Sequence, residues 1–409
     1  MLIGNRIRFV TVLAVVLILS TGCVASRVGV SWPSLSIIEY NGADKILVAY
    51  EHTVVMLEPS GEAVKLINPV NGEVRTDAKG APLTWSLDGN AFGAQFFSAP
   101  IWYDEETLLF STYSEKLILV DSIKPSPETS TTIPIRSKVI ADLIEYDGTY
   151  LLPSHENGLA AIDVVNKEYW YVPTKKGVWS SPLKVEDKLY FSSMDHFVRA
   201  IDLDNLKEYP PVNLADIGPD KEIDIEPVDI LWETDLEGAV NASPVYHDGA
   251  LYVGSMANKL FKLDPDSGEI LKSYETQNWI WSRPVIFEDT LYLTDLSGTV
   301  YALNPTDLSL IWKSKVAERG IRPSPILTDE FVIVASRDGN IYWIDRDTGD
   351  HNFQREVDGK PELLSDMLLV EPNENNDLPE TILLVGTMDR GQLVVAYTLN
   401  GKPLWKFGA

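Results

Sequence analysis

The sequence predicts an all-β fold, an eight-bladed β-propeller built from four-stranded antiparallel blades. Three observations support this: a repeat with a 40-residue period, four short strand-like runs in each copy, and no helical period of useful length beyond the N-terminal segment. The repeat is clearest between residues 240 and 315, where Pro244 matches Pro284 and Asp264-Pro265 matches Asn304-Pro305. Repeats of this length indicate solenoids or propellers, in which each unit packs against the next.

Each copy of the repeat contains enough strands for one blade. The runs are β-branched, aromatic or alternately apolar, and in the first clear copy they are Val245–Tyr246, Leu251–Gly254, Leu260–Leu263 and Ile270–Tyr274. His247-Asp248-Gly249 and Asp266-Ser267-Gly268 separate them with the residues that tight turns require. Four strands in about 40 residues form one antiparallel propeller blade, which stays partly apolar until a neighbour covers it.

The residue that precedes the first strand marks where each repeat begins. These markers number eight, at Pro33, Pro100, Asp142, Pro182, Pro244, Pro284, Pro325 and Asp366. The two long spacings, after Pro33 and after Pro182, indicate repeats that carry an insertion. We expect a second and a third strand in every repeat, so the ring has eight blades. It would have seven if the stretched first repeat did not close as a blade.

The predicted insertions have the composition of loops. They are polar and contain prolines, and they cover Pro59–Gln95, Pro125–Pro134, Pro210–Asp229 and Glu371–Pro379. Within the first, Ala63–Ile67 and Leu83–Leu87 are candidate strands. Pro403–Phe407 follows the turn residues Asn400-Gly401 and predicts the final strand of the ring. The sequence does not decide how the ring closes.

The N-terminus resembles an export signal followed by a lipid anchor. Arg6 and Arg8 precede a largely apolar run of 11 residues, 9–19, which is too short to span a bilayer. Cys23, the only cysteine, follows a lipobox-like segment and is the expected lipidation site. We therefore predict a signal peptide at 1–22, an anchor and linker at 23–30, and one propeller domain at 31–409. The alternative is cleavage after Gly22 or Ala25 with a free thiol.

Charge and cysteine content exclude several classes of partner and site. The chain carries 60 acidic and 34 basic residues, a net charge of −26, which repels phosphate backbones and makes nucleic acid an unsuitable partner. A single cysteine excludes an internal disulfide and any site built from several thiolates.

The repeat residues resemble the PQQ-like β-propeller repeat over about residues 31–407. The resemblance rests on Leu251-Tyr-Val-Gly-Ser255, followed by Leu263-Asp-Pro265 and Gly268, and on their counterparts in the next copy. Together with the signal, the lipobox-like Cys23 and eight blades, it is similar to the BamB-like barrel-assembly lipoproteins. That likeness implies a non-enzymatic envelope scaffold. The quinoprotein alcohol dehydrogenases of this superfamily place PQQ beside paired cysteines and a calcium site, and no segment here matches either, so we expect no cofactor.

The loops that lead into the first strands predict a binding face. We expect these entering loops and the turns between second and third strands to open on one side of the ring. Four aromatic residues are assigned to the same position, or phase, of their repeats: Trp32, Phe97, Trp179 and Trp281. There they would surround the mouth of the central channel with aromatic side chains. The alternative is that these rings cap the core between blades.

Three arginines are expected near this mouth. Arg283, Arg322 and Arg337 are notable in so acidic a chain, and they would either bind a carboxylate or pair with neighbouring acids.

Other chemistries lack the residues that they require. His52, His155 and His196 fall in turns of blades that are not all adjacent, so we expect no metal site. The sequence contains no nucleophile motif with a supporting histidine and no glycine loop for phosphate. We predict an exported, lipid-anchored, monomeric scaffold that binds an envelope protein or an extended polymer through one face. The alternatives are an enzyme at the channel mouth, either a quinoprotein or a glycan hydrolase, and a carbohydrate-binding module.

Overall fold

A computed structural model describes residues 32–68, 70–156, 158–217 and 226–408. Residues 31–409 form one compact unit. The predicted signal peptide at 1–22 and the anchor and linker at 23–30, with Cys23, lie outside the described residues. Within the described ranges, no helix is long and apolar enough to cross a membrane.

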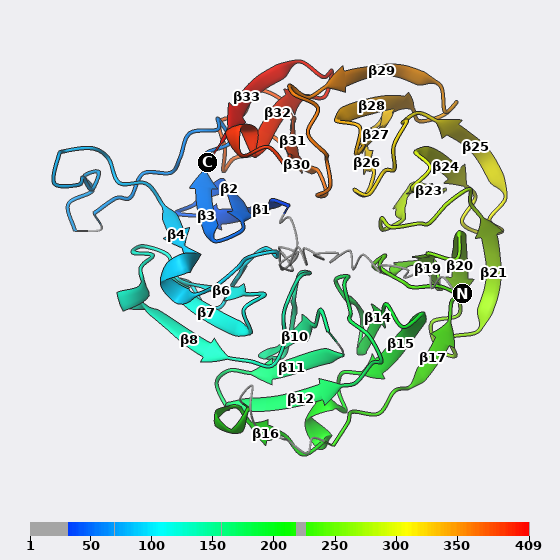
Figure 1. Cartoon of the computed structure of the whole chain (residues 1–409), viewed down its shortest axis with the longest axis horizontal. Coiled ribbons are helices and arrows are strands. Elements are labelled where there is room, and N and C mark those ends of the chain that lie inside the picture. Colours follow the sequence, from blue (N-terminus) through cyan, green and yellow to red (C-terminus); the bar gives the residue numbers. More distant parts are fainter. Residues whose placement is uncertain (1–31, 69, 157, 218–225, 409) are drawn as a thin grey trace, which may run out of the picture. The chain divides into compact units, whose positions relative to one another are not determined.

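Eight antiparallel sheets follow one another around a ring (Figure 1). Blade 1 contains β1 (Ser34–Tyr40), β2 (Ala43–Tyr50), β3 (Thr53–Leu57) and β4 (Ser86–Asp88), and blade 2 contains β5 (Ile101–Trp102), β6 (Thr107–Ser111), β7 (Lys116–Asp121) and β8 (Ser130–Pro134). Blade 3 contains β9 (Ile144–Tyr146), β10 (Thr149–Pro153), β11 (Leu159–Asp163), β12 (Glu168–Val172) and β16 (Val212–Asn213). Blade 4 contains β13 (Leu183–Val185), β14 (Lys188–Ser192), β15 (Phe197–Asp202) and β17 (Trp232–Asp235).

The second half of the chain is more regular. Blade 5 contains β18 (Val245–His247), β19 (Ala250–Ser255), β20 (Lys259–Leu263) and β21 (Ile270–Glu275), and blade 6 contains β22 (Val285–Phe287), β23 (Thr290–Thr294), β24 (Thr299–Leu303) and β25 (Leu310–Lys315). Blade 7 contains β26 (Ile326–Leu327), β27 (Phe331–Ala335), β28 (Asn340–Asp345) and β29 (His351–Glu356). Blade 8 contains β30 (Leu368–Val370), β31 (Ile382–Gly386), β32 (Val394–Thr398) and β33 (Pro403–Phe407). Among the described residues, five short 3-10 helices lie in connections: η1 (Gly89–Phe92), η2 (Pro127–Thr129), η3 (Leu206–Glu208), η4 (Leu214–Asp216) and η5 (Arg390–Gln392).

The prediction of eight four-stranded blades is confirmed, with β16 added to blade 3 as a fifth strand, and the seven-blade alternative is wrong because the first repeat closes as blade 1. The interpretation of Pro125–Pro134 as a loop is wrong in its second half. Residues Ser130–Pro134 form β8, which pairs along β7 as the fourth strand of blade 2. This strand lies at the outer rim, where side chains meet water on both faces, so its composition resembles that of a loop.

The insertion Pro210–Asp229 also contributes a strand. It leaves blade 4 after β15, and β16 pairs with the outer edge of β12 in the preceding blade, with Val212 opposite Tyr169. Leu214 and Ile217 then pack into the apolar core between blades 2 and 3. The insertion thus covers an edge that would otherwise be unpaired.

Local sequence explains the hairpins inside the blades. Asp248 and Gly249 both adopt positive φ, 46° and 73°, which the two-residue turn between β18 and β19 requires and which Asp-Gly provides at little cost. The strands β19 and β20 are almost wholly buried because neighbouring blades cover both of their faces, whereas β21 at the rim is largely exposed.

A separate apolar cluster fills each interface between neighbouring blades, which we call a seam. Six seams share a further device, in which an indole N–H donates to a backbone carbonyl between the third and fourth strands of the next blade. The donors are Trp85, Trp170, Trp232, Trp312, Trp343 and Trp405, and the acceptors are the carbonyls of Ser122, Tyr209, Pro265, Arg346, Leu399 and Pro59. Each bond satisfies a polar atom that burial would otherwise leave without a partner.

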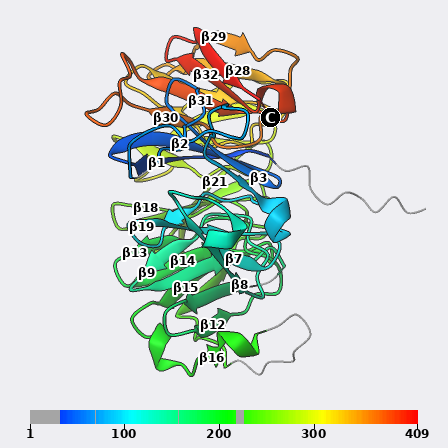
Figure 2. The same ribbon diagram turned by 90° about the vertical axis from the view of Figure 1, so that its left-hand side faces the viewer.

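The ring closes by packing, and no strand of the described residues is exchanged between its two ends. The four strands of blade 1 and the four of blade 8 each come from one continuous stretch of chain. In the edge-on view these two blades lie against each other (Figure 2), and residues of β2, β31 and β32 share one apolar cluster. Polar contacts join them as well: Trp405 Nε1 donates to Pro59 O at 3.1 Å, and Arg390 Nη2 lies 2.7 Å from Glu51 Oε2.

Candidate functional site: the channel mouth

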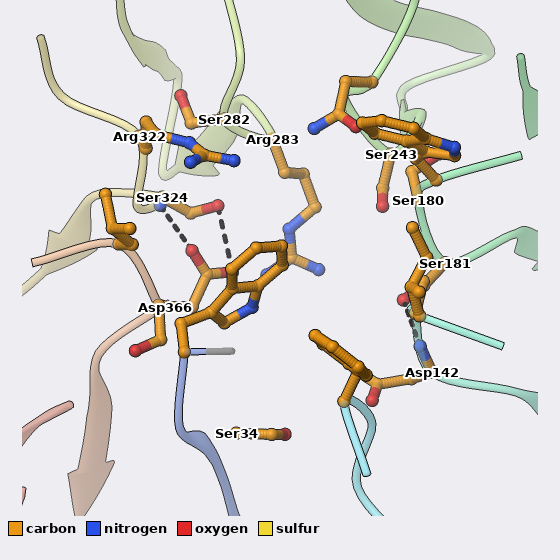
Figure 3. Close-up of a pocket in the computed structure, with 18 of the residues that line it drawn as sticks. Ser34, Asp142, Ser180, Ser181, Ser243, Ser282, Arg283, Arg322, Ser324 and Asp366 are labelled. Atoms are coloured by element: carbon orange, nitrogen blue, oxygen red, sulfur yellow. Dashed lines mark hydrogen bonds between the residues drawn. The ribbon is translucent and has the colours of Figure 1, made fainter. Parts of the chain in front are cut away.

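A cavity of about 230 Å³ opens at the centre of the ring, and we call it the channel mouth. All eight blades contribute residues to its wall, which places it on the ring axis. The wall comes from the entering loops and includes Trp32, Ser34, Phe97, Asp142, Trp179, Ser180, Ser181, Ser243, Trp281, Ser282, Arg283, Arg322, Ser324, Ser365 and Asp366. Figure 3 shows how arginine, aspartate and serine side chains from different blades gather around this space.

Six of the seven residues predicted for a binding face line this cavity, namely Trp32, Phe97, Trp179, Trp281, Arg283 and Arg322. Arg337 is not among the lining residues, and its guanidinium Nη2 instead lies 3.1 Å from Glu362 Oε1. For Arg337 the expectation of pairing with a neighbouring acid is therefore confirmed.

The predicted phase of Trp32 is wrong, although the residue still reaches the mouth. Phe97, Trp179 and Trp281 each stand three residues before the proline of their repeat, whereas Trp32 directly precedes Pro33. Arg322 stands three residues before Pro325, so it occupies in blade 7 the position that tryptophan holds in blades 4 and 6.

Half-buried rings connect blades 1 to 4 in a continuous series, which we call the aromatic band: Trp32, Phe97, Tyr113, His155 and Trp179. Successive ring centroids lie 5.9, 5.4, 5.3 and 4.9 Å apart. Only the last pair is stacked, since His155 and Trp179 are 15° from parallel while the other pairs meet at 56° to 78°. The band supplies apolar surface with polar edges along one side of the mouth.

Sequence reasoning missed Tyr113 and considered His155 only as a metal ligand. Both residues lie in turns between the second and third strands of their blades. The sequence predicts that these turns open on the same face as the entering loops, which agrees with the position of both residues beside the mouth. An inspection of these turns for aromatic residues would have found them. The described residues contain no group of three or more His, Cys, Asp or Glu side chains placed to hold a metal. His52 instead contacts the carbonyl oxygen of Ala94 through its Nδ1 at 2.5 Å.

Arg322 lies between two indoles. Its guanidinium carbon is 3.9 Å from the ring centroid of Trp281 and 5.4 Å from that of Trp32. Burial lowers the pKa of Arg322 to about 10, and the nearby charge of Arg337 acts in the same direction. Its Nε is buried without a hydrogen-bond partner, and none of the ion pairs found within the described residues includes Arg322. The indoles stabilise this cation, but no anion neutralises it.

Two aspartates take the place of the repeat proline in blades 3 and 8. Asp142 Oδ1 accepts a hydrogen bond from Ala99 N at 3.0 Å, and Asp366 accepts from Ser324 N at 2.6 Å. Each carboxylate therefore ties its own entering loop to that of the preceding blade. The entering loop of blade 4 is connected in the same way to that of blade 3, because Asp142 N donates a hydrogen bond to Ser181 Oγ (Figure 3).

The surroundings of Asp142 disfavour its charge. Its side chain is exposed to the water of the channel, but the surrounding residues of the mouth reduce its hydration, which raises its pKa. The charge of Asp366 acts in the same direction, whereas the Ala99 N–H and the cation of Arg283 act against it. Arg283 is exposed at the mouth, and its side chain extends toward the centre of the cavity (Figure 3).

Serine hydroxyls complete the wall. Ser282 Oγ is occupied by a hydrogen bond with Thr294 Oγ1 at 2.8 Å. Ser180 Oγ and Ser365 Oγ are buried and have no hydrogen-bond partner within the described part of the chain. The mouth thus combines two cations, hydroxyl groups and an apolar band, which are the components of a binding site.

Comparison with known proteins confirms the resemblance to BamB-like, PQQ-repeat propellers. A family model described as outer membrane protein assembly factor BamB matches residues 223–367 and 271–408. Proteins with the same description from Yersinia pestis and Nitrosomonas eutropha are 25% and 28% identical over 152 and 127 residues. These matches cover 34% and 31% of this chain, and 36% and 31% of the relatives' own lengths, so the chain spans about a third of the relatives that it matches.

Solved structures support the fold alone. BamB from Moraxella catarrhalis has a TM-score of 0.56 and 13% identity, with 76% of this chain and 88% of that chain covered. The computationally designed Ika8 protein has a TM-score of 0.58 and 12% identity, with 91% and 97% covered. A designed ring and a natural one thus share this architecture, so function must be argued from the site.

Proposed function

We propose that this chain is an exported, non-enzymatic scaffold that binds a protein partner through its channel mouth and acts in the assembly of cell-envelope proteins. The similarity to outer membrane protein assembly factor BamB supports the general role. The observation that carries the choice of surface is the aromatic band, together with Arg283 and Arg322, on the face where all eight blades converge.

The physical chemistry of the mouth suits protein binding. Aromatic and arginine side chains dominate the energetics of protein interfaces because they combine large apolar area with directional polar contacts. Here five half-buried rings lie in succession, and neither Arg283 nor Arg322 forms an ion pair within the described residues. A partner that covers them would gain apolar burial and supply the missing acceptors.

Crosslinking in intact envelopes, followed by isolation of the protein with any bound partner, tests this proposal. The experiment compares two triple variants of the full-length protein. In the mouth variant Phe97, Trp179 and Trp281 are changed to alanine; in the control Leu231, Leu271 and Ile311, which are 49%, 50% and 50% exposed, are changed in the same way. We expect a stable protein partner with the wild type and the control, and its loss with the folded mouth variant. A partner retained by the mouth variant would remove this surface from the proposal, and capture of no partner by the wild type would remove the scaffold role.

Attachment to a membrane through a lipid on Cys23 is part of the proposal. The lipobox-like residues before Cys23 support it, and the propeller then acts as a single tethered ring on the extracytoplasmic side. We expect Cys23→Ser to abolish incorporation of a labelled fatty acid and to release the folded protein from membranes. Unchanged labelling would place the anchor elsewhere, and absence of label in the wild type would favour the free-thiol alternative.

A further inference from the structure

The channel mouth contains a cation, Arg322, that forms no ion pair within the described residues. Arg322 is held by Trp281 and Trp32, its Nε has no acceptor, and burial lowers its pKa to about 10. The acidic group whose charge stabilises this cation, Glu362, already contacts Arg337 and Arg319. A half-buried guanidinium of this kind is stabilised most when a ligand brings the negative charge.

The acids of the mouth do not fill this role. Asp366 accepts hydrogen bonds from the backbone N–H and the hydroxyl of Ser324, and Asp142 accepts one from Ala99 N. Both carboxylates are thus engaged in joining neighbouring entering loops. Arg283, by contrast, is exposed at the same cavity, and no ion pair found in the described ranges includes it.

We propose that the channel mouth binds the C-terminal carboxylate of an extended, apolar polypeptide segment. The carboxylate would meet Arg322 and Arg283, with hydroxyl groups such as that of Ser180 nearby, and the preceding residues would lie along the aromatic band. This inference rests on the proposed scaffold function and specifies the group that the scaffold recognises. Capture of a terminal carboxylate by fixed donors is a recurring mode of peptide recognition.

Charge and size favour one carboxylate over a polyanion. The cavity of about 230 Å³ has room for a residue or two, and its wall carries two arginines and two aspartates, Asp142 and Asp366. A ligand with a single negative group therefore changes the net charge of the mouth by only one unit. A polymer with a charge on every unit would be repelled by these acids and by the net charge of −26.

The orientation of the rings favours an apolar peptide over a glycan. Sugars bind aromatic side chains mainly through an open, flat ring face. Here His155 covers one face of Trp179, and the guanidinium of Arg322 covers one face of Trp281. Trp32, Phe97 and Tyr113 meet one another at steep angles, which leaves edges and corners that suit branched apolar side chains.

The experiment measures binding of fluorescein-labelled hexapeptides to the purified full-length protein. The peptides have apolar C-terminal residues and no charged side chain, and they are identical except that one ends in a free carboxylate and the other in an amide. We expect the amide to bind about ten- to hundredfold more weakly, because hydrogen bonds to a charged group are lost. Arg322→Gln should reduce binding of the free acid to the level of the amide, and Arg283→Gln should weaken it to a smaller extent.

Lys313→Gln is the matched control, because it also removes one cation, from the exposed rim strand β25. It should leave binding of both peptides unchanged. Thermal unfolding of each variant separates loss of binding from loss of the fold, and an Arg322→Lys variant keeps the charge if the glutamine variant is unfolded. A free uronic acid serves as a competitor; displacement of the peptide by it at equal concentration would overturn the preference for a polypeptide.

The outcomes distinguish this inference from the proposed function. Equal binding of acid and amide would overturn carboxylate recognition while leaving peptide binding and the scaffold role intact. Binding of neither peptide would overturn the inference, and the crosslinking experiment would then decide by itself whether a folded partner uses the same face. Binding of the acid that survives Arg322→Gln would move recognition away from this residue and would also count against the inference.

Discussion

Tryptophans in the seams and at the channel mouth have opposite environments. Trp343 in the seam between blades 7 and 8 is fully buried, donates its indole N–H to Leu399 O at 2.7 Å and stacks on Phe353. Trp281 at the mouth is only half-buried, and its ring supports a cation that has no anion beside it. In six seams the indole N–H has its acceptor within the fold, whereas Arg322 at the mouth forms no ion pair within the described residues.

The difference between the seams and the mouth follows from the sequence repeat. Seam positions recur around the ring, and six seams use the same indole-to-carbonyl bond. The mouth is built where the repeat is broken: aspartate replaces proline at Asp142 and Asp366, and Arg322 stands where blades 4 and 6 have tryptophan. Regular positions thus produce the ring and place Phe97, Trp179 and Trp281 at the mouth, and irregular positions add charged groups there.

The largest effect should come from removing a seam tryptophan. Trp343→Ala deletes a fully buried ring and leaves the carbonyl of Leu399 without its donor, so we expect a loss of about 3–5 kcal/mol in the free energy of unfolding. Urea denaturation followed by circular dichroism measures it. The control Trp279→Ala, at a side chain 48% exposed, should cost less than about 1 kcal/mol. Equal losses for the two variants would contradict the contrast between buried and exposed indoles.

The seam between blades 8 and 1 provides a more selective test of how packing between blades contributes to stability. Gly61 has a φ of +88°, and a Cβ built there would lie 2.5 Å from Trp405 Cδ2. Gly61→Ala should therefore destabilise the protein by about 1–3 kcal/mol through overpacking, in addition to backbone strain. Gly80→Ala is the matched control, since Gly80 has a φ of +82° and no atom within 4 Å of its Cβ position. If the two variants unfold at the same temperature, Trp405 does not hold the seam as described.

At the mouth, Trp281→Ala should affect stability much less than Trp343→Ala. Its ring is partly exposed and packs on a single guanidinium, so we expect a loss of about 1 kcal/mol. Binding at the mouth should nevertheless be impaired, because Arg322 loses the closer of its two indoles. Unfolding and crosslinking measured on the same preparation separate the two effects. A stability loss as large as that of Trp343→Ala would show that the mouth residue is structural.

The smallest effect is expected for Asp142→Asn, and its sign depends on pH. The pKa of Asp142 is raised in the folded protein, so the folded state binds the proton more tightly than the unfolded state. The stability that this group contributes is thus greatest below its unfolded pKa of about 3.9 and decreases as the pH rises through the folded pKa. Asparagine keeps an acceptor for Ala99 N and carries no charge.

We therefore expect the variant to be within about 0.5 kcal/mol of the wild type near pH 4 and to become relatively more stable toward pH 7. Thermal unfolding of both proteins across this range measures the difference. A variant that becomes relatively less stable as the pH rises would show that the Asp142 carboxylate is stabilised in its charged form.

Most of the ring could be predicted because its signals are local. Alternating apolar residues and Asp-Gly turns specify each hairpin within a few residues, as at Asp248-Gly249. Phe97, Trp179 and Trp281 could be assigned to the mouth because repeat phase fixes where an entering loop points.

The missed features depend on contacts between blades. The strand β16 is two residues long and exists only because the edge of β12 is available in the preceding blade. The aromatic band passes through Tyr113 and His155, which are brought together by turns of different blades, and no periodicity links them. Trp32 reaches Phe97 from outside the expected phase.

Blades 8 and 1 exchange no strand within the described part of the chain, and this arrangement has a kinetic consequence. Every other pair of neighbouring blades is joined by a short stretch of chain, but these two are separated by nearly the whole ring, as the pairing of Arg390 with Glu51 shows. Bringing such distant segments together costs more loop-closure entropy, by about 0.6 kcal/mol for each doubling of the separation. This junction should form last as the protein folds and separate first under mechanical load. The ring would then open between blades 8 and 1 while the other blades stay in contact.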